Sequence, residues 1–153
     1  MWADEIIIVD SGSTDQTPQI ANTYATKYVI EPWRGYTGQK QFGCSLCSND
    51  WVFVLDSDEV VSPKLANAIQ ALTPEELDKH DLFWVSRKNY VFGKYVRAWD
   101  PDWQSRLIHK DRVTWVEHAL HEGRKGQSPD REGKLSGRLM HKPVGPVEFT
   151  DYF

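Results

Sequence analysis

The chain has 153 residues, a formal net charge of −4 and a pI near 5.7. This length suffices for one domain with a hydrophobic core. The acidic balance argues against a nucleic-acid binder that relies on a basic surface. No apolar run approaches membrane-spanning length and no signal-peptide pattern is visible, so we expect a cytoplasmic protein.

The first elements alternate between strand and helix. Glu5–Asp10 is a short apolar run that ends in an acid, which predicts a buried strand. Ser11–Asp15 is rich in residues that cap helices, and a helix is expected from about Thr17 to Tyr24. Lys27–Glu31 then predicts a second short strand.

A loop over Pro32–Gly38 precedes a predicted helix over Gln39–Ser48, which contains both cysteines of the chain. Cys44 and Cys47 have the spacing of a redox or half-zinc motif, but no second pair of this kind exists. We therefore expect two small thiols that pack the helix.

The most informative stretch is the apolar run Trp51–Leu55, which stops at Asp56, Ser57, Asp58 and Glu59. Such a run predicts a strand buried on both faces, as in parallel sheets, where ligands bind beyond the carboxyl ends of the strands. Residues two apart point to the same side of an extended segment, so Asp56 and Asp58 can face one divalent cation. The alternative is a solvated acidic turn.

Alternation of strands and helices with short connections predicts parallel β-α-β units over residues 1–72. Parallel strands share their carboxyl ends, so Asp10 and Asp56 are expected at one edge of the sheet. We interpret residues 82–153 as the second part of the same single domain, with mixed and mostly antiparallel pairing.

The later elements are predicted from apolar runs and turn residues. A helix is expected from Ser62-Pro63 to about Leu72, with a further capped turn at Thr73, and residues 123–137 are expected to form a loop rich in Gly, Pro and charge. The predicted strands are Phe83–Phe92, Gln104–Ile108, Val113–Val116 and Leu135–Met140.

These segments resemble the family 2 inverting glycosyltransferases of the GT-A fold, an α/β, Rossmann-like mixed sheet that binds nucleotide-diphospho-sugars. The resemblance runs in order over nearly the whole chain. Its general motifs are Ala3–Asp15, Gly38–Lys40 and Leu55–Glu59. Other segments are similar to the lipopolysaccharide-core branch, which adds glucose in a β-1,4 linkage to inner-core sugar: Phe92-Gly93, Asp100–Leu107, Leu120–Glu122 and His141.

The resemblance implies a UDP-glucose donor and a divalent cation, Mg²⁺ or Mn²⁺. Asp10 matches the acid that recognises the uracil or its ribose. Asp56 and Asp58 match the D-x-D pair, with Asp56 nearer the ribose and Asp58 on the metal. Breaking the sugar–diphosphate bond develops negative charge on the leaving phosphate, which a cation stabilises.

Three further residues match family positions near the nucleotide. Lys40 matches a loop lysine, and Arg106 and His141 match positions that meet the diphosphate or the metal. Without the resemblance, Lys40 is equally well a solvated helix lysine, Arg106 an exposed strand residue and His141 a loop histidine.

Inverting transfer needs a base that takes the proton of the acceptor hydroxyl. Asp102 lies in the Asp100–Leu107 segment, and Glu122 lies in the His-Glu motif of the branch. Both stay candidates, with a slight preference for Asp102.

The chain departs from the family pattern at its start. Family members have a further strand between those that end at Asp10 and Asp56, whereas Met1–Glu5 leads directly into the second family strand. We therefore expect a domain shortened at the N-terminus, and at the C-terminus by the same comparison. The two strands then pair directly, a second copy supplies a strand in a homodimer by strand exchange, or the isolated chain folds poorly.

The leading functional hypothesis is transfer of a hexose from UDP-glucose to a lipopolysaccharide or other glycan acceptor, in peripheral contact with the cytoplasmic face of the inner membrane. The alternative is a non-catalytic glycosyltransferase-like remnant that binds sugar or a partner chain. A nucleotidyltransferase is less well supported, because no Gly-rich phosphate loop bearing Arg or Lys follows the first strand.

Overall fold

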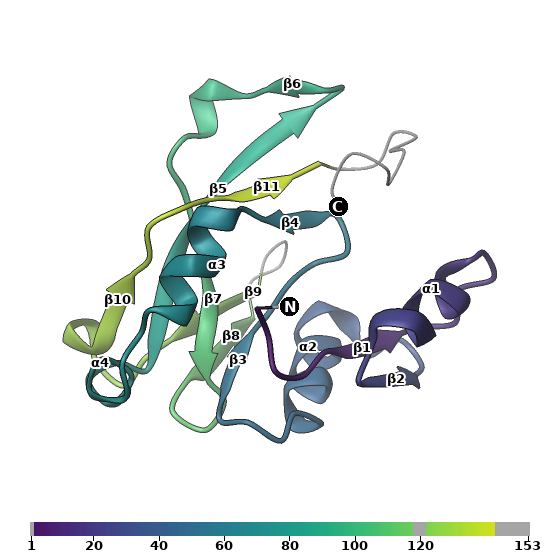
Figure 1. Cartoon of the computed structure of the whole chain (residues 1–153), viewed down its shortest axis with the longest axis horizontal. Helices are drawn as coiled ribbons and strands as arrows, with labels where there is room; N and C mark the ends of the chain where they lie inside the picture. The colour runs from purple at the N-terminus through teal and green to yellow at the C-terminus, as the bar shows by residue number, and fades with distance from the viewer. Residues whose placement is uncertain (1, 118–121, 143–153) are drawn as a thin grey trace.

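The computed structural model describes residues 2–117 and 122–142, arranged as two small sheets beside a larger mixed sheet with helices packed on it (Figure 1). The α-helices are α1 (Thr17–Tyr24), α2 (Gly35–Ser45), α3 (Pro63–Gln70) and α4 (Pro74–Lys79), and the 3₁₀ turns are η1 (Arg97–Trp99) and η2 (Pro129–Arg131). The strands are β1 (Ile7–Asp10), β2 (Lys27–Ile30), β3 (Trp51–Phe53), β4 (Glu59–Val61), β5 (Leu82–Val91), β6 (Lys94–Tyr95), β7 (Asp102–His109), β8 (Thr114–Glu117), β9 (Glu122–Lys125), β10 (Glu132–Lys134) and β11 (Leu139–His141).

The N-terminal unit is the predicted β1-α1-β2. The two strands are parallel, with Ile7 opposite Lys27 and Asp10 opposite Ile30. Pro18 lies in the first turn of α1, where its missing amide hydrogen is tolerated, and Ala21 is the buried residue of the helix. This unit lies to one side of the larger sheet (Figure 1).

The larger sheet has the order β3-β7-β5-β11-β4, with β10 and β6 also paired to β5. β5 is antiparallel to β7 and parallel to β11, which confirms the mixed pairing expected for the second half of the chain. The curled mixed sheet is that of the GT-A, Rossmann-like α/β fold.

The position of β3 differs from the sequence prediction. β3 runs antiparallel to β7 at the edge of the larger sheet, with Trp51 opposite His109 and Phe53 opposite Leu107. It does not pair with β1, so the N-terminal half is not one continuous parallel sheet. The apolar run correctly predicted a strand, but apolar character does not specify the direction of the neighbouring strand.

The residues of β5 and β7 alternate between two apolar clusters, because successive side chains of a strand point to opposite faces. The cluster on the face covered by α3 and α4 contains Leu65, Phe83, Val85, Leu107, Leu135 and Leu139. The opposite cluster, on the α2 side, contains Cys44, Val54, Leu82 and Ile108. Burial raises the pKa of the Cys44 thiol to about 11, as expected for a packing residue.

Residues 123–137 were expected to form a loop, and this prediction is wrong, since parts of β9 and all of β10 lie there. Arg131 donates to Asp81 at 2.8 Å, and Glu132 accepts from the Trp84 indole at 2.8 Å. Gly133 is required beside Phe83, because an added Cβ would lie 2.5 Å from the ring. These tertiary contacts overrode the local turn signals.

Side-chain caps mark the starts of α3 and α4. The Ser62 side chain accepts from the Leu65 amide at the start of α3, and Thr73 and Glu76 form the capping box of α4. α2 begins at Gly35, four residues before the predicted start at Gln39. Across the part of the chain that the structure describes, no helix has the length and apolar character needed to cross a bilayer.

Candidate functional site

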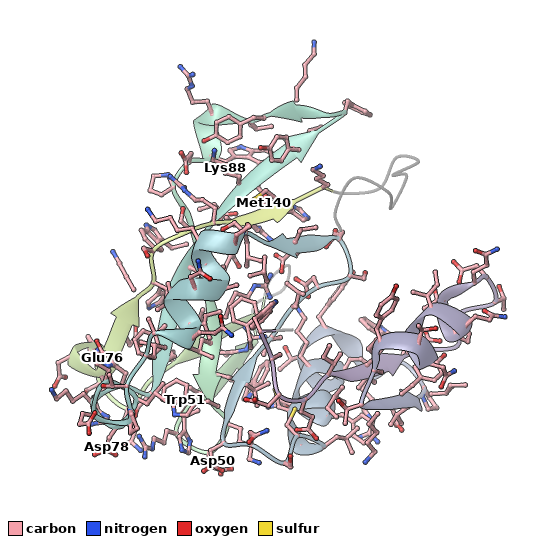
Figure 2. All side chains as sticks on the ribbon, in the orientation of Figure 1. Asp50, Trp51, Glu76, Asp78, Lys88 and Met140 are labelled. Atoms are coloured by element: carbon pink, nitrogen blue, oxygen red, sulfur yellow. The ribbon has the colours of Figure 1, made fainter. Side chains whose placement is uncertain are left out.

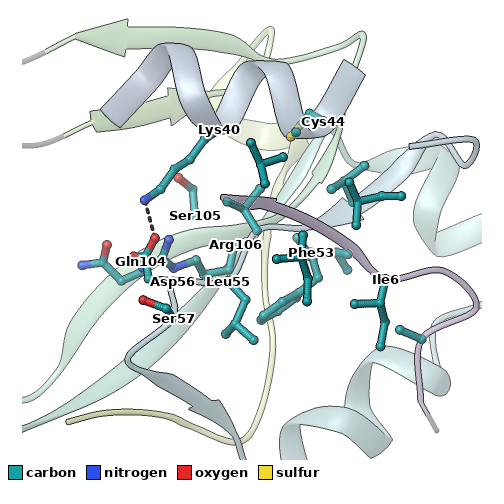
Figure 3. A pocket seen from close by; sticks show the side chains of 18 of the residues that line it. Ile6, Lys40, Cys44, Phe53, Leu55, Asp56, Ser57, Gln104, Ser105 and Arg106 are labelled. Carbon is teal, nitrogen blue, oxygen red and sulfur yellow. Dashed lines mark hydrogen bonds and ion pairs between the residues drawn. The ribbon is translucent and has the colours of Figure 1, made fainter. Parts of the chain in front are cut away.

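A large hollow of about 2470 Å³ separates β1 from β3. Its apolar walls come from Ile6–Val9 on one side and Trp51–Leu55 on the other. The charged wall is formed by Lys40, Asp56, Asp58, Asp102, Arg106 and His141, six of the residues predicted for the site. Figure 3 shows Lys40, Asp56 and Arg106 of this wall, with Lys40 reaching from α2 toward Asp56.

Asp56 follows β3 and is held by two cations. Lys40 Nζ lies 2.6 Å from one carboxylate oxygen of Asp56, and Arg106 Nη2 lies 2.7 Å from the other. Burial alone would raise the pKa of Asp56, but the charges of Arg106 and Lys40 outweigh it and lower the pKa to about 2. Asp56 is therefore a carboxylate with a fixed orientation at neutral pH.

Arg106 is not the exposed strand residue of the alternative interpretation, because it is only 2% exposed. Its Nη2 also lies 2.5 Å from Oε1 of Glu59, the first residue of β4. The same Glu59 oxygen lies 3.1 Å from Nη1 of Arg87 on β5. Glu59 and Arg87 were not singled out from the sequence, yet they link Asp56 to the rest of the site.

Asp102, the first residue of β7, lies at the other end of this link. Arg87 Nε and Asn89 Nδ2 each donate to Asp102 Oδ2 at 2.9 Å, and Gln104 Nε2 donates to Oδ1 at 2.6 Å. Burial would raise the pKa of Asp102, but the hydrogen bonds from Asn89, Arg87 and Gln104 together hold it below its usual range. Asp102 is thus an ionised carboxylate whose orientation is fixed by three hydrogen-bond donors.

Asp58 and His141 meet because β11 pairs antiparallel with β4. Asn89 fixes the imidazole: its amide nitrogen donates to Asp102, so its oxygen accepts from His141 Nδ1 at 2.7 Å. Nε2 of His141 then faces Asp58 Oδ2 at 3.2 Å. With Nδ1 donating to Asn89, the Nε2 lone pair of the imidazole faces this carboxylate, an arrangement that a bound cation between the two side chains would stabilise.

The Asp58–His141 pair fits a divalent metal as a two-residue donor set. Two neighbouring ligands of an octahedral ion at about 2.1 Å lie roughly 3 Å apart, close to the separation observed here. Among residues 2–117 and 122–142, however, no three His, Cys, Asp or Glu side chains group together as a metal site. Any ion held here needs further ligands from substrate or water, as is usual for Mg²⁺.

Asp10 lies at the end of β1 and is buried, but it does not line the hollow. Its carboxylate accepts from the Ser13 amide and hydroxyl and from the Tyr28 hydroxyl, the last at 2.7 Å. Burial would raise the pKa of Asp10, but these hydrogen bonds lower it, and the bond to Asp10 raises the pKa of Tyr28 to about 12. In this arrangement Asp10 orders the turn after β1.

The structure describes only the backbone of the second candidate base, Glu122. The backbone of Glu122 opens β9, opposite Glu117 of β8, but its side chain lies outside the described part of the chain. Sequence reasoning missed Glu59, Arg87 and Asn89. The strand pattern could have indicated Arg87 and Asn89 together, since polar residues two apart on a predicted strand share a face.

The mixed α/β fold, with Asp56 and Asp58 shortly after β3, is typical of a GT-A type of domain. A family model described as glycosyl transferase family 2 matches residues 3–126. The chain therefore belongs to glycosyl transferase family 2.

Curated relatives support this assignment. An uncharacterized glycosyltransferase of Rickettsia conorii is 54% identical over 67 residues, covering 44% of this chain and 24% of the relative. The lipopolysaccharide core biosynthesis glycosyltransferase LpsC of Rhizobium meliloti is 43% identical over 97 residues, covering 58% of this chain and 34% of that protein. The matched segments thus span about a third or less of these relatives.

Proposed function

We propose that the charged wall binds a nucleotide-diphospho-sugar and that the protein catalyses metal-dependent, inverting transfer of a hexose to a lipopolysaccharide or other glycan acceptor. Glucose from UDP-glucose is the proposed donor. The observation that carries this proposal is Asp56 held between Lys40 and Arg106, beside the Asp58–His141 pair. Family membership and the similarity to LpsC of Rhizobium meliloti, a lipopolysaccharide core biosynthesis glycosyltransferase, support the sugar chemistry.

Donor binding uses both signs of charge on this wall. Lys40 and Arg106 supply the cations that a diphosphate needs, while the Asp56 carboxylate accepts hydrogen bonds from ribose hydroxyls. Asp10 is proposed to bind the uracil or ribose. For this, one Asp10 oxygen must give up its hydrogen bond from Ser13 or Tyr28 and accept one from the nucleotide instead. Arg106 keeps its orientation during binding, because Glu59 holds it from within the fold.

Asp58 and His141 would hold Mg²⁺ or Mn²⁺. When bound, such an ion neutralises the negative charge that develops on the leaving diphosphate. Asn89 contributes by binding His141 Nδ1, which directs Nε2 toward Asp58. Partners of this kind commonly fix the orientation of metal-binding imidazoles.

The proposed reaction exchanges one bond at the anomeric carbon of the donor. The acceptor oxygen attacks this carbon from the face opposite the diphosphate, the carbon–oxygen bond to the diphosphate breaks, and its electron pair leaves with UDP. The proton of the acceptor hydroxyl passes to Asp102, or to Glu122 if that residue is the base. Because the pKa of Asp102 is lowered, it accepts the proton only as the hydroxyl becomes acidic in the transition state.

The hollow between β1 and β3 favours an added strand. Within the described residues, β1 pairs only with β2 and β3 only with β7, so the two edges that face the hollow have no strand partner. We infer a homodimer in which a second copy supplies a strand to this place. Light scattering of the purified chain tests it: a dimer mass supports strand exchange, and a monomer that still binds UDP contradicts it.

A direct assay separates the enzyme from the non-catalytic alternative. The purified chain is incubated with UDP-glucose, Mn²⁺ and a glycolipid acceptor, and UDP release is measured. Release that disappears in Asp56→Asn but persists in Lys27→Met, an exposed control on β2, supports transfer. UDP binding without any release would instead support the non-catalytic alternative, a remnant that binds a sugar nucleotide. The proposed location is the cytoplasmic face of the inner membrane.

A further inference from the structure

The hairpin of β5 and β6 carries an apolar side chain that the fold does not use. Phe92 occupies its tip and is 98% exposed. Phe92 and Gly93 have φ angles of 50° and 72°, which form a tight two-residue turn. Gly93 adopts this conformation readily, whereas a Phe rarely does. An exposed aromatic ring in an unfavourable backbone conformation does not stabilise this chain, which suggests a contact outside it.

The same hairpin is locally basic in an acidic protein. The chain has 22 Asp and Glu residues, but none lies between Leu82 and Trp99. Of the four cations in this stretch, Arg87 is paired inside the site. The other three, Lys88, Lys94 and Arg97, lie on the hairpin or directly after it, and Lys94 and Arg97 are exposed.

Aromatic rings support the base of the hairpin. Tyr90 and Tyr95 are cross-strand partners whose ring centroids lie 5.9 Å apart, and Lys88 Nζ lies 5.3 Å from the Tyr95 ring. Trp99 follows in η1 and is 56% exposed. The hairpin projects away from the rest of the molecule, beyond Lys88 (Figures 1 and 2). Its tip can therefore reach a flat surface that lies beyond the larger sheet.

We propose that this hairpin docks the protein on an anionic lipid bilayer. Phe92 inserts into the interface between headgroups and acyl chains, and Lys88, Lys94 and Arg97 bind lipid phosphates. The three cations of the hairpin complement an anionic membrane surface. The chain as a whole has a net charge of −4 and would be repelled by such a surface if it approached with another face. An acidic protein would attract the cations too, but it offers no apolar layer for an isolated ring at a hairpin tip.

Docking in this way would bring the site close to the membrane. Asn89, which contacts both Asp102 and His141, precedes Phe92 by three residues, roughly 10 Å along an extended strand. This distance suits an acceptor sugar attached to a lipid. That consequence rests on the proposed function, whereas the docking surface itself does not.

Vesicle co-sedimentation tests the docking surface with the whole 153-residue chain. Vesicles of phosphatidylcholine alone are compared with vesicles that also contain phosphatidylglycerol, at low and at high salt. We expect binding only to the anionic vesicles, weakened by salt. Phe92→Ala should lower the partition coefficient about tenfold, while Phe92→Trp retains binding. Lys94→Glu combined with Arg97→Glu should abolish it.

Two control variants on β2 match these changes in chemistry. Ile30→Ala removes another exposed apolar side chain, 64% exposed, and Lys27→Glu reverses another exposed charge. Both should bind vesicles as the wild type does. Equal losses in the control and hairpin variants, binding of Phe92→Ala at the wild-type level, or no vesicle binding by the wild type would each overturn the proposal. The UDP affinity of the same variants is expected to be unchanged. Measuring it tests nucleotide binding independently of membrane docking, so that a failure of one proposal can be told from a failure of the other.

Discussion

Arg106 on β7 and Glu59 on β4 form an ion pair inside the fold, 2.5 Å between Nη2 and Oε1, with side chains 3% and 0% exposed. The same nitrogen of Arg106 lies 2.7 Å from Asp56, at the edge of the hollow. The ion pair therefore fixes the cation that in turn fixes the Asp56 carboxylate. A residue without contact to the hollow thus positions the residues that line it.

Replacing Glu59 by Ala should lower the free energy of unfolding by about 3–5 kcal/mol, because it leaves buried arginine charge without its carboxylate. Urea unfolding followed by circular dichroism measures the change. The matched control is Glu75→Ala, an exposed acid in the first turn of α4, which should cost no more than about 1 kcal/mol. Similar losses in the two variants would contradict a structural role for Glu59.

Replacing Lys40 by Met should weaken UDP binding about tenfold, since one charge-assisted contact to the diphosphate is lost. Calorimetric titration of UDP measures the affinity, and Lys27→Met on β2 provides a surface control with the same change. If Lys40→Met binds UDP as tightly as the control does, Lys40 serves only to hold Asp56.

Acid should destabilise the protein partly through Asp56. Its pKa in the folded state, about 2, lies below the value of about 3.9 in an unfolded chain. A lowered pKa stabilises the fold above the unfolded value, and this stabilisation is lost as the pH falls from about 4 toward 2. It amounts to something on the order of 2 kcal/mol.

Urea unfolding of the wild type and of Asp56→Asn at several pH values between 2 and 5 isolates this contribution. Other carboxylates with lowered pKa, such as Asp10 and Asp102, act in both proteins, so the comparison removes them. We expect a shallower dependence on pH in the variant. Parallel curves for the two proteins would show that Asp56 is not stabilised by its cations.

Asp102→Asn should lower the rate of transfer about 10²–10⁴-fold while UDP affinity stays within a factor of a few. The reason is that the base acts on the acceptor hydroxyl and not on the nucleotide. The assay measures initial rates of transfer alongside UDP titration. Glu122→Gln tests the other candidate under the same conditions. A large loss in Glu122→Gln with little change in Asp102→Asn would assign the base to Glu122.

Much of the site was predictable because its residues follow strands or belong to strong motifs. Asp56, Asp58 and Lys40 were expected near one ligand, and the structure places them on one wall. Local sequence could not predict Glu59 as the buried partner of Arg106, because it stands beside three polar residues that are typical of a turn. Its burial depends on strands that are distant in the sequence.

The strand pairing of the fold was likewise not predictable from local sequence. Apolar runs predicted strands at β1, β3 and β5 correctly, but direction and pairing depend on contacts between distant segments. β3 accordingly pairs antiparallel with β7 instead of extending the β1–β2 sheet. The glycine content around Gly133 predicted a loop. In the structure Gly133 lies in β10, where the absence of a side chain allows close packing against Phe83.

We propose above that Asp58 and His141 hold a divalent cation beside a nucleotide-diphosphate site. The most direct test is calorimetric titration of UDP into the wild type and Asp58→Ala, each with Mn²⁺ and with EDTA. We expect Mn²⁺ to tighten UDP binding to the wild type at least tenfold and to have no such effect on the variant. Equal UDP affinity in all four titrations, or no UDP binding at all, would contradict it.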